Sequence, residues 1–285
     1  MVEQMLVDSH VHFWDPQERR HAWLDGHPSL QRRFGPDDYG GGRRVAALIF
    51  VQADCRDDEA LDEVRWAAEL AARDPRVRGI VAYAPLHLGA RAAAPIAAVA
   101  AQPGVVGVRR LLQDEPPSTV DDPALVRGVR MLADHGLPFD LCVRHQQLRA
   151  VSALVAACPD VTFVLDHLGK PPVATGALVP WRDDLAQLAA SGRVVCKLSG
   201  LTTEAAPGWR PADLRPYLDV ALDVFGPERC MVGSDWPVST LATTVEAWFD
   251  LVLEATAQLA PGERDAVLHD TARSIYGVVP EAENA

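Results

Sequence analysis

Two histidines near the N-terminus, His10 and His12, are the residues whose types and spacing most directly suggest chemistry. They stand two positions apart at the end of a short apolar run, residues 6–12. Successive side chains of a strand point to opposite faces, so both imidazoles would point the same way. Two imidazoles on one face are half of a metal site or of a catalytic cluster. The other half must come from elsewhere in the chain.

The elements that could position such partners are eight short runs rich in Val, Ile, Leu or Phe. These runs cover residues 6–12, 45–51, 79–84, 105–111, 138–143, 161–166, 194–198 and 230–233. Helical patterns such as residues 57–73 and 211–225 separate them. Buried strands that alternate with helices predict one (β/α)8 TIM barrel domain over residues 1–285. A doubly wound sheet is the alternative, but the glycine-rich phosphate turn that usually accompanies it is absent from the sequence.

In a barrel of this kind the active site lies at the C-terminal ends of the strands. His167 follows the sixth run and Asp235 follows the eighth, so both would reach the end that carries His10 and His12. Imidazoles with a carboxylate suit one divalent cation, Zn²⁺ foremost, and the aspartate can take a proton from an attacking water. Without a metal, the histidines could still polarise a carbonyl by hydrogen bonding. We therefore expect these four residues to be catalytic, with one divalent metal or none bound among them.

Other residues near the same strand ends are candidates for substrate binding. They are Arg109, Trp14, Gln52, Lys170 and Trp236, with Arg110 and Arg144 competing for the role of Arg109. The two tryptophans would form apolar walls. A long irregular connection, residues 13–44, follows the first strand and is either a lid or a passive excursion. His21 and His27 lie in it and would reach the site only if it folds over.

Composition limits the classes of partner. The chain has 27 basic and 39 acidic residues and a formal net charge of −12, which argues against nucleic acid or an anionic membrane as the main partner. An odd number of cysteines, five, without a C-x-x-C pair indicates reduced thiols and a cytoplasmic protein. The sequence shows neither a signal segment nor an apolar span of membrane length. Assembly into homo-oligomers is left open.

Five motifs in order along the chain carry a family resemblance. They are V-D-S-H-V-H-F-W at 7–14, G-V-R at 107–109, F-V-L-D-H-L-G-K-P at 163–171, C-K-L-S-G-L at 196–201 and V-G-S-D-W-P at 232–237. Together they resemble the amidohydrolase superfamily, specifically its "amidohydrolase 2" branch of sugar-lactone and related lactonases. The resemblance implies that Asp235 is the general base, that His10, His12 and His167 bind a metal or polarise the carbonyl, and that Arg109 contacts the substrate.

One departure from the superfamily pattern concerns the number of metals. Many members have a bridging Lys or Glu on strand 4 and a His on strand 5. This chain has Arg109 and Arg110 at the first position, and His145 lies slightly late for the second. A binuclear site is therefore not expected.

The residues and the resemblance predict hydrolysis of a lactone, a sugar aldonolactone foremost, by water that Asp235 activates. The alternatives are a metal-dependent decarboxylase of the same branch and a non-catalytic barrel that binds a metabolite. Release of CO2 without consumption of water would identify the decarboxylase.

Overall fold

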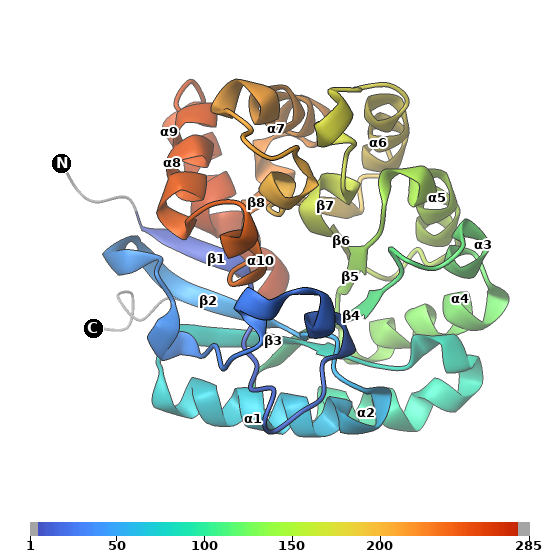
Figure 1. The fold of residues 1–285 in the computed structure, drawn as a ribbon. Coiled ribbons are helices and arrows are strands. Elements are labelled where there is room, and N and C mark those ends of the chain that lie inside the picture. The colour runs from blue at the N-terminus through green and yellow to red at the C-terminus, as the bar shows by residue number, and fades with distance from the viewer. Residues whose placement is uncertain (1–4, 279–285) are drawn as a thin grey trace.

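The computed structural model describes residues 5–278, and within that range eight parallel strands form one sheet in sequential order (Figure 1). The strands are β1 (Leu6–Val11), β2 (Val45–Val51), β3 (Val77–Tyr83), β4 (Val105–Leu111), β5 (Phe139–Cys142), β6 (Phe163–Leu165), β7 (Val194–Leu198) and β8 (Cys230–Val232). Helices cover the outside of the sheet. The prediction of a (β/α)8 TIM barrel is confirmed.

The helices follow the strands as the sequence patterns indicate. They are α1 (Ala60–Arg73), α2 (Ala93–Ala100), α3 (Pro117–Val120), α4 (Pro123–Arg130), α5 (Leu148–Ala157), α6 (Trp181–Ala189), α7 (Pro211–Phe225), α8 (Val245–Ala255), α9 (Pro261–Asp265) and α10 (Thr271–Tyr276). At α4, the Asp122 carboxylate accepts the Ala124 N–H and Pro123 occupies the first turn, which is a strong start signal. A tighter turn extends this helix to Gly136, whose φ of 64° stops it.

The barrel closes through the segment after β8 rather than through β8 itself. The Asp235 N–H donates to the His10 carbonyl at 2.8 Å, and the His12 N–H donates to the Trp236 carbonyl at 2.7 Å. These two bonds join the ends of the chain's first and last strands. Closure therefore sets Asp235 beside His10 of β1 and His12 directly after it.

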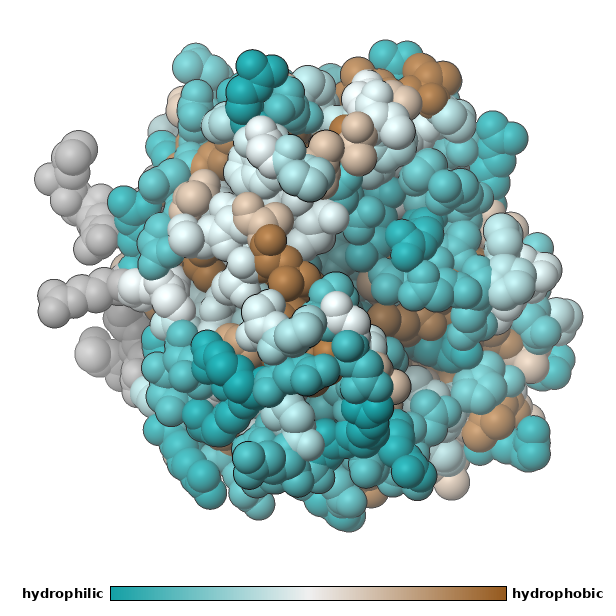
Figure 2. Space-filling model, in the orientation of Figure 1, coloured by the Kyte–Doolittle hydropathy of each residue, from teal (hydrophilic) through white to brown (hydrophobic). Residues whose placement is uncertain are grey.

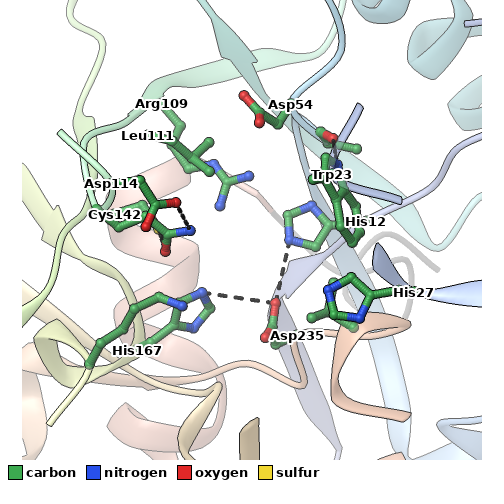
Figure 3. A pocket seen from close by; sticks show the side chains of 14 residues that line it. His12, Trp23, His27, Asp54, Arg109, Leu111, Asp114, Cys142, His167 and Asp235 are labelled. Atoms are coloured by element: carbon green, nitrogen blue, oxygen red, sulfur yellow. Dashed lines mark hydrogen bonds and ion pairs between the residues drawn. The ribbon is translucent and has the colours of Figure 1, made fainter. Parts of the chain in front are cut away.

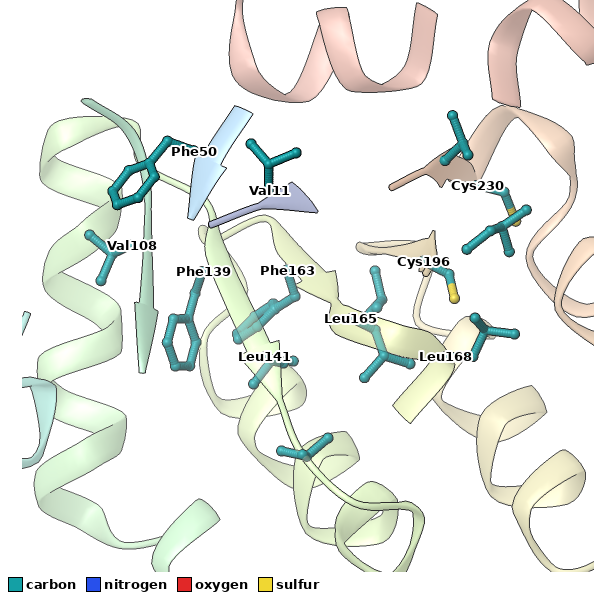
Figure 4. Packing of buried hydrophobic residues seen from close by; sticks show 14 of the residues in the cluster. Val11, Phe50, Val108, Phe139, Leu141, Phe163, Leu165, Leu168, Cys196 and Cys230 are labelled. Carbon is teal, nitrogen blue, oxygen red and sulfur yellow. The ribbon is translucent and has the colours of Figure 1, made fainter. Parts of the chain in front are cut away.

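Alternate strand residues build two apolar layers. The outward side chains pack under the helices, and Figure 4 shows part of this layer, including Phe50, Phe139 and Phe163. The inward side chains form a smaller cluster inside the barrel. Its members include Val7, Ile49, Val81, Val164, Val195 and Met231, together with Ala272, Tyr276 and Val278 from the C-terminal segment. The C-terminal segment thus helps to fill the barrel interior from the end opposite the C-terminal ends of the strands.

The connection over residues 13–44 folds back on the barrel. Trp14 and Phe34 exchange backbone hydrogen bonds of 3.0 and 2.9 Å, which closes the segment into a compact loop. Trp23 lies between them in sequence, and its indole N–H donates to the Ala53 carbonyl after β2 at 2.9 Å. The loop is therefore tied to a second strand end.

Figure 2 shows mainly hydrophilic side chains on the viewed face, with apolar ones scattered over it. Over residues 5–278 we find no helix with the length and apolar content needed to cross a membrane.

Candidate functional site

The structure brings together the four residues predicted to be catalytic. Asp235 Oδ1 lies 3.4 Å from His12 Nε2, 3.7 Å from His10 Nε2 and 3.9 Å from His167 Nε2. The Nε2 atoms of His10 and His12 are 3.1 Å apart. Figure 3 shows His12, His167 and Asp235 turned toward one another. Each of the four side chains is buried, so their charges and hydrogen bonds act in a low-dielectric environment.

Unusual backbone conformations aim two of these side chains. His167 has a φ of 54° and Asp235 a φ of 59°, in the left-handed region that non-glycine residues rarely adopt. Such residues persist only where the surrounding structure holds them, and they gather at functional sites. Here they turn the chain sharply at the ends of β6 and β8, which points both side chains back into the barrel mouth.

Asp8 holds the turn that carries Asp235 against β1. Its Oδ1 accepts the Ser234 N–H at 2.8 Å and the His10 N–H at 3.2 Å, and its Oδ2 accepts the Tyr39 hydroxyl at 2.7 Å. Burial raises the pKa of Asp8 to about 6, although these hydrogen bonds oppose the rise. The sequence analysis did not predict this anchor. The available signal was the carboxylate of Asp8 in the middle of an apolar run, because a buried charge needs partners.

The far nitrogens of the rings are also held. His12 Nδ1 lies 2.7 Å from the Val51 carbonyl, which can only accept, so this nitrogen carries a hydrogen. His167 Nδ1 lies 2.8 Å from the Ser199 hydroxyl, which can donate or accept. His10 Nδ1 lies 3.2 Å from both Asp166 Oδ1 and Lys197 Nζ.

These residues fit a divalent cation. Ligand atoms of His10, His12 and Asp235 lie within 4.8 Å of one another, and so do those of His10, Asp166 and His167. In the first set the Nε2 atoms and the carboxylate oxygen converge, and the carbonyl behind His12 fixes that ring as outer partners of metal-binding histidines do. Imidazole and carboxylate ligands in this number suit Zn²⁺.

Electrostatics sets the charge of the cluster at neutral pH. Burial lowers the pKa of His10 well below its ordinary value and that of His167 to about 4. Burial would raise the pKa of Asp235, but the neighbouring imidazoles, His167 foremost, outweigh it and lower that pKa below its usual range. Two uncharged imidazoles therefore face an ionised carboxylate, the state in which such groups bind a cation or accept a proton.

A cavity of about 310 Å³ opens beside the cluster. Its lining consists of His12, Trp23, His27, Ala53, Asp54, Arg109, Leu111, Gln113, Asp114, Cys142, His167, Lys170, Asp235 and Val238. Arg109 and Lys170 are thus on the wall, as the sequence predicts for substrate-binding residues. Arg110 pairs instead with Glu115, and Arg144 pairs with Asp114 at 2.8 Å, and neither is among the lining residues.

Three of the residues predicted to contact the substrate lie behind the cavity wall. Trp14 is 1% exposed and packs edge-on against Trp23, and Trp236 is 4% exposed and packs against the ring of Tyr39. Gln52 supports the wall, because its backbone carbonyl accepts a hydrogen bond from the Arg109 guanidinium.

The long connection supplies the aromatic wall that the sequence prediction assigned to other tryptophans. Trp23 and His27 line the cavity, so this segment does fold over the site. His21 does not reach it and lies buried with Nε2 3.9 Å from Glu63. His145 also stays outside the cluster, with Nδ1 at 3.0 Å from the Lys170 carbonyl. Asp54 on the wall was missed as well, and its place directly after a strand end was the available signal.

Comparisons with known proteins agree with this architecture. The L-fucono-1,5-lactonase of Burkholderia multivorans is 38% identical over 300 residues, which cover 99% of this chain and 98% of that protein. An L-fucono-1,5-lactonase of Burkholderia ambifaria is 35% identical, with 83% of this chain and 81% of that protein covered.

Solved structures give the same picture. An amidohydrolase from B. multivorans, crystallised in one form with HEPES and in another with Zn bound, superposes with a TM-score of 0.86 at 36% identity. The match covers 96% of this chain and all of that one. The sequence pattern of the family described as Amidohydrolase matches residues 7–278. With nearly its whole length matched, this chain belongs to the amidohydrolase family.

Proposed function

We propose that this protein hydrolyses a neutral sugar lactone and that Asp235 is the general base. The observation that carries the proposal is the convergence of three imidazoles on one ionised carboxylate at the wall of a cavity. The 38% identity to an L-fucono-1,5-lactonase supports a lactone as the substrate.

The reaction follows from the protonation states. The Asp235 carboxylate takes a proton from a water while the water oxygen bonds to the lactone carbonyl carbon. The ring C–O bond then breaks, and the proton passes from Asp235 to the departing ring oxygen, which gives an open hydroxy acid. A carboxylate with a low pKa is a weak base, so the carbonyl must also be polarised.

The chain offers groups for that polarisation. If the Ser199 hydroxyl donates to His167 Nδ1, the hydrogen of that ring sits on Nε2 and can be donated to the carbonyl oxygen. His10, His12 and Asp235 would hold a divalent cation, Zn²⁺ foremost, which would supply Lewis-acid polarisation of the same carbonyl. Preorganised donors of this kind stabilise the charge that develops on oxygen in the transition state.

The charges around the cavity support a neutral substrate. Both cationic side chains of the wall already have carboxylate partners: Arg109 lies 3.6 Å from Asp166, and Lys170 lies 3.1 Å from Glu204. A lactone that carries carboxylates would have to compete with these partners and would also meet the carboxylate of Asp54. Hydroxyl groups of a sugar lactone can instead donate to that carboxylate, and the Trp23 ring offers an apolar face.

The test is a pH-indicator hydrolysis screen over aldonolactones and carboxylate-bearing lactones, with CO2 release measured in parallel. The protein is assayed with its metal content known, and again after chelation and after readdition of Zn²⁺. Turnover of aldonolactones without CO2 release is expected. Hydrolysis of carboxylate-bearing lactones alone would contradict the neutral substrate.

Asp235→Asn tests the base. Removal of a general base lowers kcat by about 10²–10⁴-fold, and we expect a loss in that range. Asp219→Asn is the matched control, since Asp219 is an exposed carboxylate on α7 that pairs with Arg215 in the same helix. A loss of less than about tenfold in Asp235→Asn would refute the assignment.

A further inference from the structure

Beneath the cluster lies a second layer of charged side chains inside the barrel. Arg109 on β4, Asp140 on β5, Asp166 after β6 and Lys197 on β7 are each at most 3% exposed. Two cations and two carboxylates make the layer neutral when all four are ionised. The apolar interior cluster lies below it, and Tyr276 of α10 reaches up from that cluster to donate its hydroxyl to Asp140 Oδ2 at 2.8 Å.

Lys197 stands at the centre of this layer. Its Nζ lies 2.6 Å from Asp140 Oδ2, 3.1 Å from Asp166 Oδ1 and 3.2 Å from His10 Nδ1. An ammonium group has three hydrogens and no lone pair, so it can donate to all three neighbours and accept from none. Lys197 is fully buried and is not among the residues that line the cavity.

Two groups of opposite hydrogen-bonding type lie at the same distance from His10 Nδ1. A donor, Lys197 Nζ, and an acceptor, Asp166 Oδ1, both lie 3.2 Å from it. The contact with Lys197 is a hydrogen bond as it stands, whereas Asp166 Oδ1 is within reach of an Nδ1 hydrogen but has no hydrogen-bond partner among the residues that the structure describes. With the hydrogen on Nε2, the ring accepts from Lys197. With the hydrogen on Nδ1, the ring can donate to Asp166 Oδ1 after a small adjustment of the carboxylate.

The contacts of the other ring nitrogen, Nε2, decide which of the two neutral tautomers is present. Nε2 of His10 lies 3.1 Å from Nε2 of His12 and 3.5 Å from Arg109 Nη1, and His12 Nδ1 already donates to the Val51 carbonyl. The shorter contact, to the lone pair of His12 Nε2, favours a hydrogen on His10 Nε2. Without a cation, a hydrogen on His10 Nε2 completes a chain from Lys197 through both rings to Val51. A cation bound at Nε2 needs the lone pair of that atom, so the hydrogen must sit on Nδ1.

We propose that Lys197 and Asp166 are a positioning pair that lets His10 change tautomer in place, with the hydrogen on Nε2 in the metal-free site and on Nδ1 in the loaded site. The ring stays neutral, and one hydrogen leaves Nε2 while another is gained at Nδ1. Burial lowers the pKa of His10 well below its ordinary value, which agrees with a ring that carries one hydrogen in both states. The inference rests on the cation site of the proposed function and not on the substrate.

The direct test is imidazole ¹⁵N NMR of the wild-type protein without metal and with Zn²⁺. The His10 signals are assigned by their loss in His10→Asn. We expect Nε2 to carry the hydrogen in the metal-free protein and Nδ1 to carry it after Zn²⁺ is added. A ring that holds its hydrogen on the same nitrogen in both samples overturns the proposal.

A charge-balanced double variant isolates the lysine. Lys197→Met alone would leave two buried carboxylates facing one cation, whereas Lys197→Met with Asp140→Asn removes one charge of each sign. With the donor gone, we expect the hydrogen on Nδ1 even without metal. Zn²⁺, measured by competition with a chelator, should bind about 2- to 10-fold more tightly, because loading no longer breaks the bond from Lys197.

Asp140→Asn alone is the matched control, since it keeps Lys197 beside His10 and Asp166. It should show the wild-type change of tautomer. A double variant that melts like the wild type but binds Zn²⁺ more weakly would overturn the proposal, and if that variant does not fold, the wild-type spectra decide. None of these measurements uses a lactone, so a failure of the proposed hydrolysis would be seen separately.

Discussion

Acidification should destabilise the metal-free protein through His167, by an amount that the structure lets us work out. The side chain is 3% exposed, and burial lowers its pKa from 6.5 to about 4 although Asp235 and Asp166 oppose the shift. The unfolded chain therefore takes up this proton at higher pH than the folded protein. Stability is unaffected by this group above the unfolded pKa and falls as the pH drops from there toward the folded pKa.

The size of the effect follows from the two values. One pKa unit corresponds to about 1.36 kcal/mol. At pH 4.5 the unfolded imidazole is about two units below its pKa, while the folded one is still largely uncharged. His167 should then lower the free energy of unfolding by about 2.5 kcal/mol relative to pH 7.5.

The assay is urea unfolding of the wild-type protein and of His167→Asn at both pH values, with a chelator present. The comparison is needed because Asp8 and Asp140, whose pKa values burial raises to about 6, act with the opposite sign. A folded state that binds protons more readily gains stability as the pH falls. Both carboxylates are present in the two proteins, so their effects cancel in the difference.

The stability of the wild type relative to His167→Asn should fall by about 2.5 kcal/mol between pH 7.5 and 4.5. A difference that stays constant to within about 0.5 kcal/mol would show that the ring is not held uncharged, and the charge state assigned to the site would be wrong.

Two further substitutions test the walls of the site. Gly200→Ala should lower kcat at least tenfold and the free energy of unfolding by about 1–3 kcal/mol, because an added Cβ would lie 2.5 Å from His167 Nδ1 at a φ of 64°. Steady-state kinetics and thermal melting check it, and an unchanged kcat in a folded variant would contradict the placement of the ring. Trp23→Ala should raise KM about tenfold with a smaller effect on kcat, since this residue offers the cavity an apolar face and no group that takes part in the proton transfer. Equal losses in kcat and kcat/KM would instead show that Trp23 contacts the substrate only in the transition state.

The barrel and its cluster could be predicted because both depend on short-range patterns. Apolar runs without alternation indicate parallel strands, and parallel strands in a closed barrel bring all their C-terminal ends to one mouth. His10, His12, His167 and Asp235 needed only their places at those ends to be grouped. The left-handed backbone at His167 and Asp235 was not predictable, because it is imposed by the contacts of the folded barrel.

The aromatic wall could not be predicted for a definite reason. Trp14 stands two positions after His12, so continued strand alternation would have put it on the same face. The strand ends at Val11, however, and Trp14 pairs instead with Phe34 in an antiparallel bridge. Direction beyond the strand end is set by tertiary packing, and no local pattern records it. Trp23 takes the wall position from a segment with no regular period.

The buried layer of charged side chains could be predicted only in part. Charged residues such as Asp140 and Lys197 inside apolar strands signal buried partners, because an unpaired charge would be strongly destabilising there. Inward alternation could also have placed them in the barrel. What the sequence could not give is which charge meets which, since that depends on the height of each strand in the sheet.

Barrel closure and site geometry depend on the same hydrogen bonds. This explains how His10 and Asp235, 225 positions apart in the sequence, are held in a fixed geometry. The backbone bonds of His10 and His12 to the segment after β8 close the sheet, and the Asp8 carboxylate ties that segment to β1 a second time. Any loosening of closure would therefore move Asp235 relative to both histidines. Conversely, a cation shared by His10, His12 and Asp235 would link the first and last strands directly. Loading the site would thus stabilise the closure between the first and last strands as well as prepare the chemistry.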